Sequence, residues 1–167
     1  MTYKASWDNA TKIITVAITV FFIAIIIATF MDDGGNSVAG RYFIAVMIVA
    51  IYAVCYALRP VHYIVTKDKL IIHRPVSDVS LSREQMESVE LLDDKMLKWT
   101  FRTFGVGGLF GYFGKFANSK LGSMTWYATR RRKTVLIKTS QGKSIIVTPD
   151  DADDFVNQFE VHHTAIP

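Results

Sequence analysis

The sequence of 167 residues contains a single cysteine, Cys55, which lies inside an apolar run. An intrachain disulfide is therefore excluded, so the chain is not a small domain stabilised by disulfides. Cysteine is absent after residue 60, which fits a reducing compartment. Charged residues are scarce before residue 60 and frequent after it, whereas apolar residues show the opposite distribution. This asymmetry predicts a membrane part followed by a soluble part.

The common signatures of catalysis and of nucleotide binding are also missing. No G-x-S-x-G or H-E-x-x-H motif occurs. The glycine-rich stretch GVGGLFGYFGKF (residues 105–116) departs from both nucleotide motifs, because Phe110 replaces the third glycine of G-x-G-x-x-G and Phe116 replaces the P-loop hydroxyl. We therefore predict that the protein is not an enzyme and binds no nucleotide cofactor. A catalytic site assembled from residues distant in sequence remains the alternative.

Metal and nucleic-acid sites are not predicted either. The aspartates of residues 150–154 lack the alternating spacing of a calcium loop, and they match the acidic first turn of a helix instead. The two histidines at residues 162–163 have no cysteine near them that would complete a zinc site. We expect no metal and no nucleic-acid partner.

Two uncharged apolar segments, residues 13–30 and 42–58, are each long enough to cross a bilayer as a helix. Neither contains an ionisable residue, which is typical of an anchor and not of a transporter or a proton relay. A cleaved signal peptide is the alternative for the first segment, but its apolar run exceeds the usual signal core and a second span follows closely. The sequence therefore predicts a transmembrane helical hairpin.

The flanks of the two spans predict their orientation. Lys4 and Lys12 precede the first span, and Arg59 follows the second, whereas the connecting loop is acidic and has only Arg41 as a positive charge. Lysine and arginine concentrate on the cytoplasmic side of membrane proteins. We therefore expect both termini to face the cytoplasm and the connecting loop to face outward.

The soluble part alternates between apolar and polar residues in short runs, which indicates β-strands. Strands are expected over residues 62–66, 69–73, 86–92, 123–129, 134–139 and 144–148, and SREQ (residues 82–85) resembles a capping box that begins a short helical turn. The pattern changes to helical spacing after Thr148, which is expected to be the N-cap of a C-terminal amphipathic helix with Pro149 at its first position. About six or seven antiparallel strands closed by one helix are predicted.

At this point the sequence resembles a known family. Two spans run directly into RPVHYIVTKDKLIIHR (residues 59–74), then into FGVGGLFGYFGKFANSKLG (104–122) and a helix start TPDDADDFV (148–156). This order resembles the bacterial pleckstrin-homology-like (PH-like) membrane proteins over nearly the whole chain. The resemblance implies a bent, seven-stranded antiparallel barrel or sandwich with a C-terminal capping helix. It also implies a location in the bacterial cytoplasmic (inner) membrane. The expected parts are a transmembrane hairpin (1–60), a cytoplasmic PH-like domain (61–160) and a flexible tail (161–167).

The glycine-rich stretch has two interpretations. In the first, its glycines allow turns and close backbone approach while its aromatic residues are buried in the domain. In the second, it forms an exposed aromatic loop that contacts the membrane interface or a partner. The residues of that loop would be Leu109, Phe110, Tyr112 and Phe113.

Basic residues offer a second surface. The run RRRK either forms a solvated turn or attracts anionic lipid headgroups, and the basic residues of the first hairpin could join it. In phosphoinositide-binding PH domains the first hairpin is basic, and only three positions here match it. The residues concerned are Lys67, Lys69, Arg74, Arg130, Arg131, Arg132 and Lys133.

Two functions follow from these observations. The first is a non-enzymatic interaction module, tethered to the membrane, that binds a protein partner or its own copies. The second is a sensor of anionic lipid headgroups that uses the basic residues and the aromatic loop.

Overall fold

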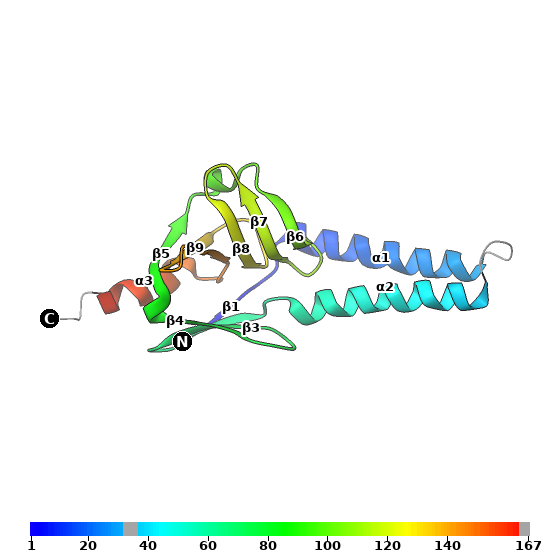
Figure 1. Cartoon of the computed structure of the whole chain (residues 1–167), viewed down its shortest axis with the longest axis horizontal. Helices are drawn as coiled ribbons and strands as arrows, with labels where there is room; N and C mark the ends of the chain where they lie inside the picture. Colours follow the sequence, from blue (N-terminus) through cyan, green and yellow to red (C-terminus); the bar gives the residue numbers. More distant parts are fainter. Residues whose placement is uncertain (32–36, 164–167) are drawn as a thin grey trace.

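The computed structural model describes residues 1–31 and 37–163, with side chains described as far as residue 159. Two long helices, α1 (Asn9–Met31) and α2 (Val38–Leu58), contain the two predicted spans. Both are long and apolar enough to cross a membrane, and only 6% of each is buried inside the protein. Figure 1 shows them side by side, projecting from one end of the β domain, with the C-terminal helix at the opposite end. They are therefore not core helices of the soluble domain, which supports a membrane-associated protein.

The two helices pack against each other through a few side chains. The hydroxyl oxygens of Thr19 and Tyr52 lie 2.9 Å apart and share a hydrogen bond. The ring of Tyr52 also meets Phe22 edge to face, and near the far end Phe30 meets Tyr42 in the same way. The remaining large apolar side chains of the hairpin are mostly exposed, as expected for a surface that faces lipid.

The β domain consists of two sheets that do not close into a barrel, so it is sandwich-like. The first sheet has the order β1-β2-β3-β4, and the second has the order β5-β9-β10-β8-β7-β6. The strands are β1 (Thr2–Lys4), β2 (His62–Val65), β3 (Lys69–His73), β4 (Val79–Ser82), β5 (Met86–Leu92), β6 (Phe101–Gly107), β7 (Tyr112–Asn118), β8 (Gly122–Ala128), β9 (Thr134–Thr139) and β10 (Ser144–Val147).

The arrangement of the strands differs from the sequence-based expectation. Not every strand pair is antiparallel, since β10 runs parallel to β8. The glycine-rich stretch, for which no strand was expected, forms most of the antiparallel hairpin β6–β7. Short 3-10 helices, η1 (Arg83–Gln85) and η2 (Asp94–Leu97), flank β5; η1 confirms the helical turn predicted at SREQ, although the Ser82 side chain makes no capping bond.

Strand β1 comes from the segment that precedes both membrane helices. It pairs antiparallel with β2, with Tyr3 opposite Tyr63. The Tyr3 hydroxyl donates to Asp154 Oδ2 at 2.6 Å, and its ring meets Phe155 edge to face. The N-terminal segment is thus part of the same domain as the C-terminal helix. The start of α1 and the end of α2 are therefore both attached to the β domain.

Helix α3 (Ala152–His163) covers one opening of the sandwich, as predicted. It begins four residues after Thr148, and Asp151 acts as the N-cap because its Oδ1 accepts from the Asp154 N–H at 3.1 Å. The prediction of Thr148 as N-cap was therefore wrong. The Thr148 hydroxyl is buried and accepts instead from the Thr129 N–H at 2.9 Å. Residues 161–163 belong to the helix, and residues 164–167 lie outside the described part.

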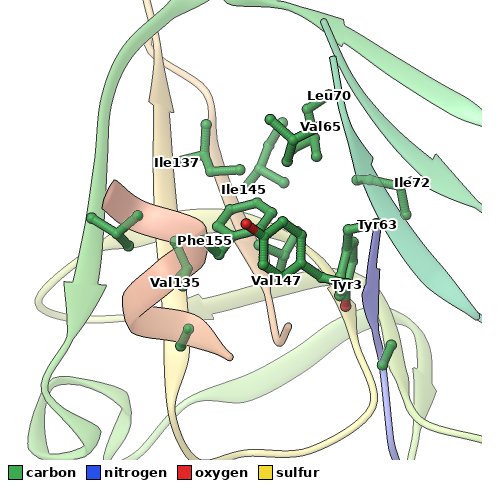
Figure 2. Close-up of a cluster of buried hydrophobic side chains, with 13 residues drawn as sticks. Tyr3, Tyr63, Val65, Leu70, Ile72, Val135, Ile137, Ile145, Val147 and Phe155 are labelled. Carbon is green, nitrogen blue, oxygen red and sulfur yellow. The ribbon is translucent and has the colours of Figure 1, made fainter. Parts of the chain in front are cut away.

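The core lies between the two sheets and α3. Figure 2 shows Phe155 of α3 surrounded by Tyr3 of β1, Tyr63 of β2 and Val147 of β10. A second cluster, which includes Trp126, is formed by side chains of the second sheet and of η2. Complete burial of a Phe or Leu side chain stabilises a fold by about 1.5–3 kcal/mol, so these clusters supply the main stabilising contacts.

Candidate functional site

The turn between β6 and β7 lies against the base of the membrane hairpin. Gly108 and Gly111 close it through a bond from the Gly108 N–H to the Gly111 carbonyl at 2.8 Å. Both glycines have positive φ, +122° and +138°, which disfavours any residue with a side chain. A Cβ added at Gly108 would lie 2.8 Å from Cγ2 of Ile14 in α1. Glycine is therefore required for the turn to approach the helix.

Thr15 of α1 holds this turn directly. Its hydroxyl oxygen accepts from the Phe110 N–H at 3.0 Å, and the same hydroxyl donates to the Gly108 carbonyl at 3.3 Å. One turn earlier in the helix, the Thr11 hydroxyl donates to the Thr129 carbonyl at 2.8 Å. Both threonines are buried. The first two turns of α1 are thus bonded to two separate loops of the β domain.

The Phe110 side chain packs among aromatic side chains of α2 and of the segment that precedes α1. Its ring centroid lies 5.0 Å from Tyr52, 5.4 Å from Tyr56 and 5.8 Å from Trp7. The Arg59 guanidinium lies over three of the four rings, at 4.2 Å from the Tyr56 centroid. A cation is attracted to the face of an aromatic ring. The Arg59 guanidinium therefore holds the end of α2 against the turn.

The two interpretations of the glycine-rich stretch can now be compared with the observed burial. The four aromatic-loop residues are buried inside the chain, with exposed fractions of only 4–6%: Leu109, Phe110, Tyr112 and Phe113. The stretch is therefore not an exposed aromatic loop, and its tip is covered by the protein's own membrane helices. The interpretation with glycine turns and buried aromatic residues describes it correctly.

A different group of aromatic residues is exposed. Trp99, Phe101 and Phe104 have exposed fractions of 91%, 61% and 77%. They lie on or directly before β6, which is an edge strand paired only with β7 among the described strands. Phe101 and Phe104 are opposite Ala117 and Lys115, so they share one face of the sheet. This group was not predicted from the sequence, although the aromatic residues of WTFRTF lie among polar ones, which is a signal for an exposed strand.

The predicted basic residues fall into four groups. Because His62 pairs with His73, Arg74 lies at the α2 end of the first hairpin, whereas Lys67 in the turn and Lys69 at the start of β3 lie at the far end (Figure 1). Arg130 is half-buried and forms an ion pair with Asp150. Arg131, Arg132 and Lys133 are exposed in the loop between β8 and β9, next to the Thr129 carbonyl that accepts from α1.

Arg130 and Asp150 form an ion pair that fixes this loop to the start of the C-terminal segment. Arg130 Nη1 lies 2.7 Å from Asp150 Oδ1. The same carboxylate accepts from the Ser6 N–H at 3.0 Å and from its hydroxyl at 2.6 Å. Partial burial acts to raise the pKa of Asp150, but the Ser6 bonds and the Arg130 charge outweigh it, so the pKa lies below its ordinary value.

A shallow groove of about 380 Å³ opens beside β6. The buried rings of Tyr112 and Phe116 form its apolar part, and two exposed arginines form its charged part. Arg131 lies over the Tyr112 ring at 5.6 Å and donates from Nη2 to the Thr100 carbonyl at 3.2 Å. Arg102 enters from β6. Within the described part of the chain, neither arginine takes part in an ion pair, and no acidic residue lines the groove.

The structure offers little for a metal. Among residues 1–31 and 37–159, no group of three or more His, Cys, Asp or Glu side chains is placed to hold an ion. His62 and His73 stack with ring centroids 4.4 Å apart, and His73 forms a hydrogen bond with Asp78.

The hydroxyl of Tyr63 is buried in the domain. It donates to the Tyr127 carbonyl at 2.6 Å, and burial raises the pKa of Tyr63 to about 12, so it stays a hydrogen-bond donor.

Comparison with known proteins identifies the soluble domain. A family model described as "Bacterial PH domain" matches residues 61–163, which is more than half of the chain. No curated protein matches the chain. No solved structure matches it either. The match covers the two sheets from β2 onward and the C-terminal helix, while β1 and the membrane hairpin precede it.

Proposed function

Since the chain belongs to the bacterial PH domain family, we propose that it is a non-enzymatic module, tethered to the membrane, that binds a protein partner. PH domains are generally binding modules, which supports a role in interaction. The membrane hairpin carries no ionisable residue in its apolar runs and makes a simple anchor. The proposal therefore needs a surface on the β domain that a partner can reach.

The exposed aromatic residues Trp99, Phe101 and Phe104 supply that surface, and they carry the proposal. Large exposed apolar groups cost hydration free energy, and clusters of them mark interaction sites. They accompany an edge strand, whose free backbone N–H and carbonyl groups can pair with an added strand. An extended segment of a partner would pair with β6 and place its own apolar side chains against Phe101 and Phe104.

A photo-crosslinking amino acid at position 101 of the full-length chain tests this in intact cells. The matched control is position 76, since Val76 is 73% exposed but lies in the turn between β3 and β4. We expect one discrete adduct from position 101, absent from position 76 and lost in the double variant Trp99→Ser/Phe104→Ser. An adduct of twice the chain mass would identify the partner as a second copy. Equal adducts from both positions, or none, would contradict the proposal.

A second candidate function is the binding of anionic lipid headgroups, favoured by the position of Arg74, Arg132 and Lys133 near the base of the hairpin. Each such charge is worth about 1 kcal/mol close to an anionic surface. In a titration of the full chain, affinity for a soluble short-chain phosphatidylglycerol should exceed that for phosphatidylcholine and fall as salt rises. The triple variant Arg74→Gln/Arg132→Gln/Lys133→Gln should bind phosphatidylglycerol more weakly. An unchanged affinity would show that these residues do not contribute to lipid binding.

We also propose that both termini face the cytoplasm. The bonding of β1 and of the β domain around one end of the hairpin supports a common side, and Lys4, Lys12 and Arg59 on that side support the cytoplasmic one. In a Cys55→Ala background, a cysteine at position 37 should react with an impermeant maleimide on intact cells, and one at position 77 should not. The reverse labelling would overturn the orientation.

A further inference from the structure

The groove between Arg102 and Arg131 has the composition of an anion site. Two guanidinium groups without an ion-pair partner in the described chain face a space lined by no carboxylate. Guanidinium groups present paired N–H donors that match phosphate and carboxylate oxygens. Arg131 is also oriented already, because its contact with the Tyr112 ring and its bond to the Thr100 carbonyl restrict its rotation. Part of the entropy cost of binding is therefore avoided.

The position of the groove relative to the membrane helices limits which ligands it can bind. Gly107 lines the groove and precedes Gly108, whose carbonyl accepts from Thr15. On the other side, Arg131 follows Thr129, whose carbonyl accepts from Thr11. Thr11 and Thr15 flank the point where the uncharged run of α1 begins. The Gly107 end of the groove and the loop that carries Arg131 are therefore held near the start of the membrane span, which favours a ligand at the membrane surface, while Thr100 lines the groove just before the other end of β6.

We propose that this groove binds a phosphate group, with the two arginines as ligands and the Tyr112 and Phe116 rings against the apolar part of the same molecule. The groove volume is at the lower end of the range for small-molecule sites and suits a headgroup and not a whole lipid. The phosphate of an anionic phospholipid is one source, and a soluble phosphate ester is the other. The inference deepens the lipid-binding candidate function and is independent of the protein partner.

The groove is distinct from the surface charges considered for that function. Arg74, Arg132 and Lys133 do not line it, whereas Arg102 was not among the predicted basic contacts. A surface attraction would depend on the number of charges close to the bilayer. Binding in the groove would depend on two particular side chains and on the shape of the guanidinium group. The two effects can therefore be separated by variants of equal charge.

The test uses the full-length chain in a neutral detergent and isothermal titration calorimetry. The probes are dihexanoyl phosphatidylglycerol, dihexanoyl phosphatidylcholine, glycerol phosphate and inorganic phosphate. The groove variant is Arg102→Gln/Arg131→Gln, and the control of equal charge is Lys120→Gln/Lys143→Gln, which changes two exposed turns. A third variant, Arg102→Lys/Arg131→Lys, keeps the charge and removes the planar fork. Thermal midpoints without ligand show whether each variant is folded.

We expect the groove variant to bind at least about tenfold more weakly, since each charge-assisted bond contributes 1.5 kcal/mol or more. The lysine variant should also lose affinity, and the control should change less than about twofold. Binding of phosphatidylglycerol alone identifies a lipid, and equal binding of glycerol phosphate identifies a soluble ester. Failure of every phosphate probe to bind overturns the proposal. The proposal is also overturned if the groove variant binds phosphatidylglycerol like the wild type while the Arg74/Arg132/Lys133 variant binds it more weakly. Attraction by the surface charges would then account for the binding.

Discussion

The hydroxyl of Thr15, in the first membrane helix, accepts the Phe110 N–H at 3.0 Å and donates to the Gly108 carbonyl. One side chain of the anchor thus satisfies two backbone groups of a turn 93 and 95 residues away. The soluble domain is therefore bonded to its anchor, and not merely connected to it by the chain.

Replacement of Thr15 by valine should test this bond. Valine keeps the shape but leaves the buried Phe110 N–H without a partner, so we expect a loss of about 1–3 kcal/mol in the free energy of unfolding. Denaturant unfolding of the full chain in detergent measures it. Thr29→Val is the control, because among the described residues the Thr29 hydroxyl bonds only within its own helix, to Ile25. Equal losses in both variants would show that the contact with the turn contributes nothing.

Replacement of Gly108 by alanine should separate the helix from the turn. The new Cβ would meet Ile14 at 2.8 Å, and the backbone would be strained by about 1–2 kcal/mol at positive φ. Gly122→Ala is the matched control, because φ is +68° there but nothing lies within 4 Å of the added Cβ. Gly108→Ala should be the more destabilising, and Ile14→Ala should partly restore its stability. If the losses of stability in Gly108→Ala and Ile14→Ala simply add in the double variant, a clash between the new Cβ and Ile14 is excluded.

The bond between Tyr3 and Asp154 should stabilise the added strand β1. Tyr3→Phe removes a hydrogen bond to a carboxylate and keeps the ring against Phe155, so a loss of about 1.5–3 kcal/mol is expected. Hydrogen exchange should show faster exchange at Thr2–Lys4 than in the wild type. Tyr42→Phe serves as control, since Tyr42 is 60% exposed. Unchanged exchange in Tyr3→Phe would contradict the role of the bond.

Acid should weaken the fold through Asp150. Its pKa is lower in the native state than the ordinary value of about 3.9, so its contribution is present above that value and is lost as pH falls through the native pKa. Asp150→Asn should therefore be less stable than the wild type at neutral pH, and the two should converge below about pH 4. Unfolding curves between neutral and acidic pH measure the difference. A difference that does not change with pH would rule out the carboxylate charge as its cause.

Much of the fold could be predicted because its periodic signals are local. The two spans, the strand at residues 134–139 and the C-terminal helix each have a run of residues with one clear spacing. By contrast, β1 has only three residues, and its role depends on a partner that follows both spans. The Thr148 cap failed for a similar reason, since a buried contact with Thr129 competes with the local capping pattern.

The hairpin β6–β7 was missed because its glycines look like turn signals. Gly105 lies opposite Gly114 in the register, and a Cβ at Gly105 would come within 2.8 Å of the Gly114 Cα. The glycines therefore serve close packing of two strands, which sequence spacing does not reveal. The burial of Phe110 likewise depends on Tyr52 and Tyr56, which come from α2 and meet it only in the folded chain.

The pairing of β1 with β2 also imposes an order on assembly. Strand β1 is synthesised first, but its partner emerges only after both helices of the hairpin. The first sheet is therefore completed only once the second span has been made and has returned the chain to its starting side. A hairpin inserted with only one span across the bilayer would leave β1 and β2 on opposite faces, and the core around Tyr3 and Phe155 would stay open. Closure of this sheet thus requires β1 and β2 to meet on the same side of the hairpin.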